Sequence, residues 1–120
     1  MAWRRVPFEW GRADCALFVC SCLDAMTGSR LWSEWSDRYR SAAGSRRMLR
    51  RRGFEDLLAV ADVLLGPQLE PRLAQRGDVV AVQTPEGPAL GLCLGAWSAV
   101  KSETGLEFVA VDKLLTAWRV

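Results

Sequence analysis

The chain has 120 residues, half of them hydrophobic and a quarter charged, which is the composition of one ordinary globular domain spanning residues 1–120. Its formal net charge of +2 gives no bulk electrostatic reason to expect a nucleic-acid partner. The chain has four cysteines and no histidine. The absence of histidine excludes, within this chain, a histidine general base, a Cys–His dyad, a Ser–His–Asp triad and every histidine-containing metal site.

The N-terminal half of the sequence is predicted to be helical. Apolar residues recur over residues 14–27, where Asp14 places a negative charge at the start of the helix and Gly28 is a natural stop. Three further segments follow: a Trp-rich irregular stretch with one helical turn, a helix, and a strongly amphipathic helix, over residues 31–39, 41–52 and 54–65.

The C-terminal half changes to short β-branched or apolar runs separated by turn residues. These runs predict strands over residues 78–83, 89–94, 97–101 and 106–111, followed by a helical turn and a terminal strand within residues 112–120. Helices followed by hairpin-linked strands predict an α+β domain in which N-terminal helices pack on a small antiparallel sheet.

The segment with the clearest chemical signal is residues 8–19, FEWGRADCALFV, which places Cys15 in the first turn of the first helix. The amides and dipole of a helix N-terminus stabilise a thiolate and lower the thiol pKa, which favours a reactive cysteine. The alternative is a small buried residue at a helix start, because free cysteine is among the most buried residue types.

The pattern W-G-x-x-D-C-x-x-F-V in residues 10–19 resembles the nucleophile motif of the NlpC-type papain-like cysteine peptidases, which cleave peptide bonds in bacterial peptidoglycan. Residues 76–80, RGDVV, and residues 89–95, ALGLCLG, resemble the next two strand motifs of that family, so the resemblance covers residues 6–111. It implies an NlpC-like, papain-like fold with Cys15 at the nucleophile position. The cleft residues that it implies are Trp10, Gly11, Asp14 and Asp78.

The sequence departs from that family at the base. Alignment on Gly91 puts Ala89 at the position of the family's catalytic histidine, and the third polar position falls near Ser98 or Lys101. Conceivable substitute bases, Asp14, Asp78 and Lys101, lack the pKa near 6.5 that suits proton transfer at neutral pH. The resemblance therefore implies a peptidase-like scaffold that has lost its peptidase chemistry.

Residues 38–44, RYRSAAG, and residues 117–120, AWRV, extend the resemblance to a small domain of uncharacterised function encoded among phage and prophage tail genes. This implies a virion protein of the tail tip or baseplate hub, assembled in the host cytoplasm, with other tail proteins as partners and peptidoglycan as a further ligand. The alternative is an active cysteine peptidase or amidase that uses Cys15 with an unusual or partner-supplied base, and a third hypothesis is a thiol-dependent binding module.

Residues 46–52 contain five arginines. Three interpretations are open: a solvated helix face, the charged rim of an interface with an acidic protein, or a phosphate-binding patch. The absence of interleaved aromatic residues argues against nucleic acid. Two tryptophans nearby either contribute to an interface or cover the core. The interface candidates are Trp32, Trp35, Arg47, Arg50 and Arg51.

The cysteines at 15, 20, 22 and 93 do not match the spacing of a secreted disulfide framework, zinc knuckles or an iron–sulfur cluster. We therefore expect reduced thiols and neither a metal nor a cofactor. The first 15 residues lack the apolar core of a signal peptide, and no uncharged run approaches the ~20 residues of a membrane span.

Overall fold

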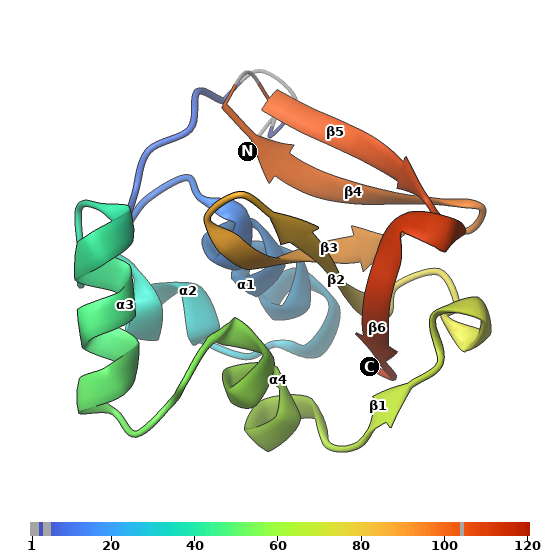
Figure 1. The fold of residues 1–120 in the computed structure, drawn as a ribbon, viewed down its shortest axis with the longest axis horizontal. Helices are drawn as coiled ribbons and strands as arrows, with labels where there is room; N and C mark the ends of the chain where they lie inside the picture. Colours follow the sequence, from blue (N-terminus) through green and yellow to red (C-terminus); the bar gives the residue numbers. More distant parts are fainter. Residues whose placement is uncertain (1–2, 4–5, 104) are drawn as a thin grey trace.

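The computed structural model describes residues 3, 6–103 and 105–120, and within them the chain has the predicted α+β architecture (Figure 1). The helices are α1 (Cys15–Thr27), α2 (Leu31–Trp35), α3 (Ala42–Arg51) and α4 (Leu57–Leu65), with short 3-10 turns η2 (Pro71–Leu73) and η3 (Val111–Lys113). The strands are β1 (Gln68–Leu69), β2 (Val79–Thr84), β3 (Gly87–Cys93), β4 (Trp97–Ser102), β5 (Gly105–Ala110) and β6 (Leu114–Trp118).

Local side-chain caps set the ends of the helices. The Asp14 carboxylate accepts the Leu17 amide at 2.9 Å at the start of α1, and Gly28 ends α1 in the left-handed conformation at φ 73°. The apolar spacing predicts that this helix begins at residue 54. In the structure the Asp56 carboxylate accepts the Ala59 amide at 3.0 Å, and α4 begins at Leu57. The cap residue therefore outweighs the hydrophobic pattern at this boundary.

The six strands form one antiparallel sheet in the order β1-β6-β2-β3-β4-β5. Strand β6 comes last in the chain but lies between β1 and β2, where the Trp118 side chain is completely buried. The sequence predicts a terminal strand here but not its position inside the sheet. The two-residue strand β1 is not predicted at all, since so short a pairing leaves no periodic signal.

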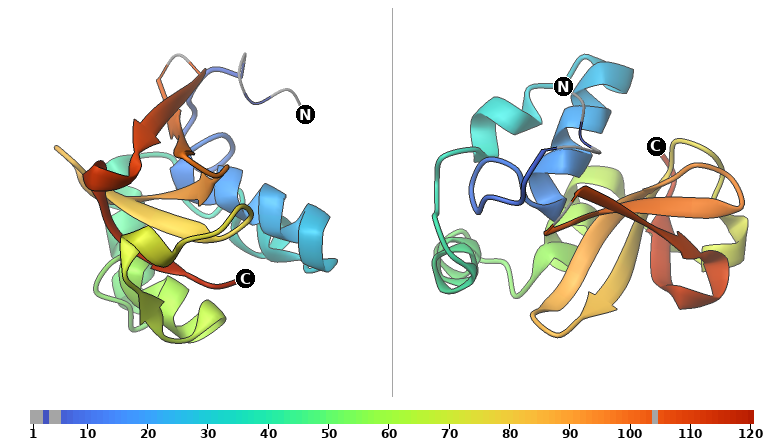
Figure 2. Two further views of the ribbon diagram at one scale, coloured as in Figure 1. Left: turned by 90° about the vertical axis from the view of Figure 1, so that its right-hand side faces the viewer. Right: turned by 90° about the horizontal axis from the view of Figure 1, so that it is seen from above.

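The helices gather on one side of the molecule and the strands on the other (Figure 2). Helix α1 packs on β3 and β4, while α4 packs on β3 and β6. Alternate residues of β2 point to opposite faces of the sheet: Val79 and Ala81 belong to the core under the helices, while Val80 and Val82 belong to apolar clusters on the other face. Both faces of the central strands are therefore buried, as the continuous apolar run in β3 predicts.

Within the described residues, no helix is both long and apolar enough to cross a membrane.

Candidate functional site

Cys15 is the first residue of α1, and its half-buried side chain packs against an apolar cluster on β2, β3 and β4. The buried members of this cluster are Val82, Ala89 and Val100. The fold thus brings the residue at the implied nucleophile position to the same cluster as Ala89, the residue at the implied histidine position. The members of this cluster surround the thiol with hydrocarbon on this side.

The environment of the Cys15 thiol raises its pKa to about 12. Burial is the main cause, and the negative charge of Asp14 adds to it, while the backbone of Leu90, just after Ala89, opposes the rise. The expectation that the helix N-terminus lowers this pKa is therefore wrong in direction. At neutral pH the sulfur carries its proton and is a poor nucleophile.

Asp14 is buried, with 1% of its surface exposed, and three donors occupy its carboxylate. These are the Gly11 amide at 3.0 Å, the Leu17 amide at 2.9 Å and the Tyr39 hydroxyl at 2.5 Å. A carboxylate held in this way joins three segments of the chain. The Cys15 thiol is not among these three donors, so the structure does not support Asp14 as a substitute base.

The Trp-Gly turn before Asp14 is fixed by contact with Tyr39. Gly11 has φ 85°, and a Cβ placed on it would lie 2.0 Å from the Tyr39 carbonyl oxygen. The Trp10 ring meets the Tyr39 ring edge-on at 6.4 Å between centroids and the Phe8 ring at 4.9 Å. Most of the W-G-x-x-D pattern therefore has a structural role in this chain.

Tyr39 is the partner that sequence reasoning missed. It is the single tyrosine of the chain and lies within residues 38–44, RYRSAAG. Burial and the Asp14 charge raise the pKa of its hydroxyl, so it remains a donor to Asp14 over the whole physiological range. No short-range pattern indicates this contact, because 25 residues separate the two partners.

Asp78, an implied cleft residue, lies away from Cys15. It directly precedes β2, and its carboxylate accepts the Gln75 amide at 2.9 Å, the Val120 amide at 3.0 Å and the Arg119 side chain at 3.1 Å. Four residues of extended chain, about 13 Å, separate it from the Val82 end of the strand. Asp78 therefore anchors the C-terminal residues and does not join the group around the thiol.

Lys101, the implied third position, also lies outside this group. Val100 points into the Cys15 cluster, so Lys101, the next residue of β4, points to the opposite face. Its ammonium donates to the Ser102 carbonyl at 2.8 Å and the Gly105 carbonyl at 3.0 Å, and burial lowers its pKa. Lys101 thereby closes the β4–β5 turn. The other residue considered for this position, Ser98, is buried opposite Cys93.

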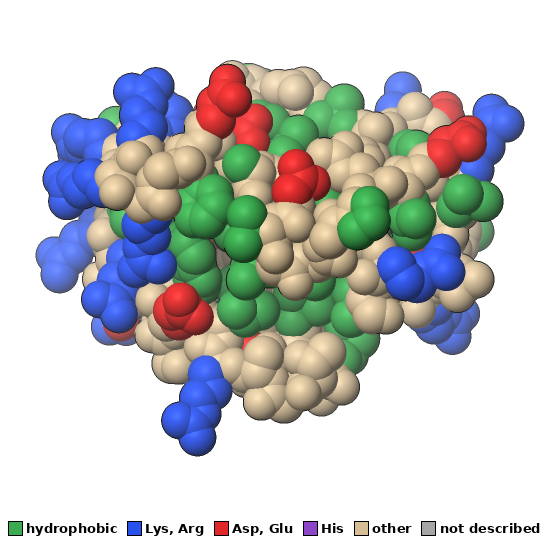
Figure 3. Space-filling view, turned by 90° about the horizontal axis from the view of Figure 1, so that it is seen from below, with side chains coloured by type: hydrophobic (Ala, Val, Ile, Leu, Met, Phe, Trp, Pro, Cys, Tyr) green, Lys and Arg blue, Asp and Glu red, His purple; other side chains and the backbone are tan. Residues whose placement is uncertain are grey.

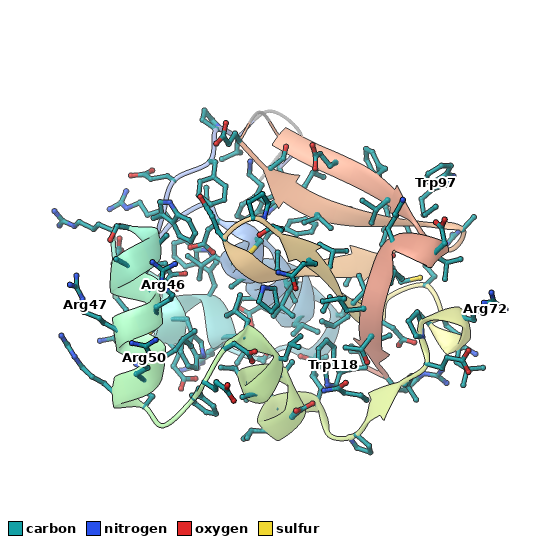
Figure 4. All side chains as sticks on the ribbon, viewed as in Figure 1. Arg46, Arg47, Arg50, Arg72, Trp97 and Trp118 are labelled. Carbon is teal, nitrogen blue, oxygen red and sulfur yellow. The ribbon has the colours of Figure 1, made fainter. Side chains whose placement is uncertain are left out.

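The two tryptophans of α2 are half-buried. The Arg52 guanidinium lies 4.3 Å from the centre of the Trp35 ring, and the Phe54 ring lies 6.5 Å from it. The predicted interface arginines of α3, Arg47, Arg50 and Arg51, are exposed, and Arg46, Arg47 and Arg50 point outward together (Figure 4). The structure therefore distinguishes the two half-buried tryptophans from these three arginines, which face solvent.

All four cysteines are free. Within residues 3, 6–103 and 105–120, no group of three or more cysteine and carboxylate side chains could hold a metal ion. No curated protein matches the sequence. The sequence model of the DUF6950 family, a domain of unknown function, matches residues 1–120, and the chain therefore belongs to that family.

Proposed function

We propose that the chain is a structural or assembly component of a phage-type tail tip or baseplate hub, built on an NlpC-like, papain-like scaffold without peptidase activity. The main argument against peptidase activity is that Cys15 packs against Val82, Ala89 and Val100 in a chain without histidine. The assignment to a tail rests on the resemblance of residues 10–19, 38–44 and 117–120.

The chemistry of a cysteine peptidase requires a thiolate and a base that shuttles the proton to the leaving group. In this chain the Cys15 pKa is about 12, and the nearest carboxylate, Asp14, is held by three donors. General-base assistance typically contributes about 10²–10⁴-fold to the rate. A protonated thiol without that assistance favours a binding role for the protein.

The order of the elements is compatible with this scaffold. A helix that begins at the cysteine packs on β3, which carries Ala89 in place of the expected histidine. The buried carboxylate of Asp14 and the Gly11 turn keep the shape of the motif after the base is gone. Retention of these packing residues favours a protein whose fold is needed although its chemistry is not.

The test compares two serine substitutions on the same helix in the phage or prophage that encodes the gene. Cys15→Ser alters the implied nucleophile, while Cys22→Ser alters a half-buried thiol elsewhere on α1. We expect the protein to co-purify with tail particles, and both variants to assemble infectious particles in equal yield. Purified wild-type protein should release no fragments from muropeptides.

Two results would contradict the proposal. Muropeptide cleavage that disappears in Cys15→Ser but not in Cys22→Ser would establish the peptidase or amidase alternative. If the wild-type protein is absent from purified particles and particles assemble normally when the gene is deleted, the proposed structural role is wrong.

A further inference from the structure

Charge is distributed very unevenly along the chain. Residues 38–54 contain seven of the sixteen basic residues and none of the fourteen acidic ones, so the rest of the chain has a net charge of −5. In the part of the chain that the structure describes, the side-chain ion pairs are Arg12–Asp37 and Arg119–Asp78. None of the seven arginines in residues 38–54 is neutralised by a carboxylate there.

Four of these arginines form the outer face of α3, here called the arginine face: Arg46, Arg47, Arg50 and Arg51. They form two rows with i, i+4 spacing, an arrangement of like charges that weakens an isolated helix. An anionic partner would remove this repulsion. Arg52 differs from the four, because it stacks on Trp35 inside the same protein.

An apolar groove lies beside the arginine face, between α3, α1 and α4. It contains an unfilled cavity of about 50 Å³ lined almost entirely by hydrocarbon, with Met48 and Leu49 of α3 on one wall. On α4, Leu64 lines the groove and is 48% exposed, while its neighbour Val63 is 71% exposed. Figure 3 shows hydrophobic side chains gathered around this hollow, with arginines at the adjoining end of the molecule.

We propose that the groove and the arginine face together dock an acidic amphipathic helix of another protein. One apolar side chain of that helix would enter the cavity between Met48 and Leu64, its apolar neighbours would cover the exposed Leu64 and Val63, and carboxylates on its flank would pair with the arginine face. Helices that bind in grooves use anchors at i, i+3, i+4 and i+7, so one helix can present both surfaces. This inference does not depend on the proposed role in a phage tail.

The surface fits this occupant better than two others. A nucleic acid would find phosphate partners on α3 but no exposed aromatic side chain there for stacking, and the groove would exclude its polar bases. A second copy of this chain lacks a suitable ligand, because each of the four described helices carries at most one acidic residue. An acidic amphipathic helix must therefore come from a different protein.

The test measures binding of the full chain to a fluorescein-labelled designed helix with glutamates on one flank and Leu, Phe and Trp at heptad-like positions. Three other probes are compared: the same peptide with lysine in place of glutamate, an oligoglutamate without apolar residues, and a single-stranded oligonucleotide. Anisotropy is read at low salt and at about 150 mM salt, where exposed charges are screened beyond about 8 Å.

We expect micromolar binding of the acidic amphipathic peptide, with a Kd of about 1–50 μM at the higher salt. The double variant Arg47→Glu/Arg50→Glu should weaken it by at least about tenfold, and Leu64→Asp should do the same, since each removes one half of the recognition. The matched control is Arg72→Glu/Lys113→Glu, which makes the same charge change on η2 and η3, with Arg72 on the opposite side of the molecule (Figure 4). It should change the Kd by less than about twofold.

Each variant is first checked by circular dichroism and thermal unfolding, and all five substituted residues are exposed, so the native fold should persist. Tighter binding of the oligonucleotide than of the peptide would overturn the proposal in favour of a nucleic-acid patch. Equal binding of the lysine peptide, no effect of Leu64→Asp, or self-association of the wild-type chain that Leu64→Asp abolishes would each overturn it as well.

Discussion

The Tyr39 hydroxyl donates a hydrogen bond to the Asp14 carboxylate at 2.5 Å and so joins the loop before α3 to the start of α1. The same carboxylate caps α1 and holds the Gly11 amide. One buried side chain therefore fixes the residues that precede Cys15. Buried networks of this kind stabilise a fold only when every member is satisfied.

Asp14→Ala should reduce the free energy of unfolding by at least about 3 kcal/mol. Loss of an N-cap costs about 1 kcal/mol, and the buried Tyr39 hydroxyl and Gly11 amide would each lose their acceptor at about 1–3 kcal/mol. The matched control is Asp56→Ala, which removes the cap of α4 with its one hydrogen bond and should cost about 1 kcal/mol. Urea denaturation of both variants measures the difference, and equal losses would contradict the network.

Gly11→Ala should be far more damaging than Gly28→Ala, although both glycines have positive φ. At Gly11 a Cβ would lie 2.0 Å from the Tyr39 carbonyl oxygen, whereas at Gly28 nothing lies within 4 Å. We expect a loss of about 1 kcal/mol at Gly28 from the left-handed conformation alone, and more than about 3 kcal/mol or no folded protein at Gly11. Thermal melting of the two purified variants provides the measurement, and similar melting temperatures would show that the Tyr39 contact is unimportant.

Cys15 should react slowly with iodoacetamide in the native protein. At about pH 8, a thiol with a pKa of about 12 has about a thousandfold less thiolate than one with a pKa of 9, and its higher intrinsic nucleophilicity recovers only about twentyfold. We therefore expect a rate about 50-fold below that of the same cysteine in concentrated urea, rising with pH throughout the alkaline range. Peptide mapping by mass spectrometry resolves the four cysteines, and fast native labelling at Cys15 would show an activated thiol.

The stability of the protein should decline in alkali. Cys15 and Cys20 each have a pKa of about 12 in the folded state against 9.0 for the ordinary thiol, so between these values the unfolded chain has lost protons that the folded chain keeps. Stability is thus fully present below about pH 9 and falls above it, by up to about 1.4 kcal/mol per pH unit for each thiol. The double variant Cys15→Ala/Cys20→Ala should show a shallower decline in urea titrations at successive pH values. An unchanged slope would mean that these thiols do not control it.

Local signals allowed the helices and most strands to be predicted from the sequence. Asp14 and Gly28 lie next to the helix that they bound, and the turn residues between the strands are equally close to them. The antiparallel sheet follows from those short connections. Such features can be predicted because the residues that determine them are close together in the sequence.

The parts that could not be predicted depend on contacts between distant residues. The place of β6 between β1 and β2 brings Trp118 beside Val79, and the Asp14–Tyr39 bond spans 25 residues. Cys15 and Ala89, which the motif singles out, lie at one apolar cluster, whereas Asp78 lies apart from it with Arg119 and Val120 as partners. The thiol pKa was also beyond sequence reasoning, because burial, which only the tertiary structure determines, exceeds the effect of the helix terminus.

The position of β6 between β1 and β2 has a consequence for how the protein folds. Until β6 has paired, β2 has an open edge, and Asp62 and Asp78 lack the side-chain donors that Trp118 and Arg119 supply. An unpaired edge beside a buried apolar strand is a site for association with other chains. The β2 edge is therefore open to association with other chains until β6 has paired with it, so a chain in which β6 is slow to dock is the form most exposed to aggregation.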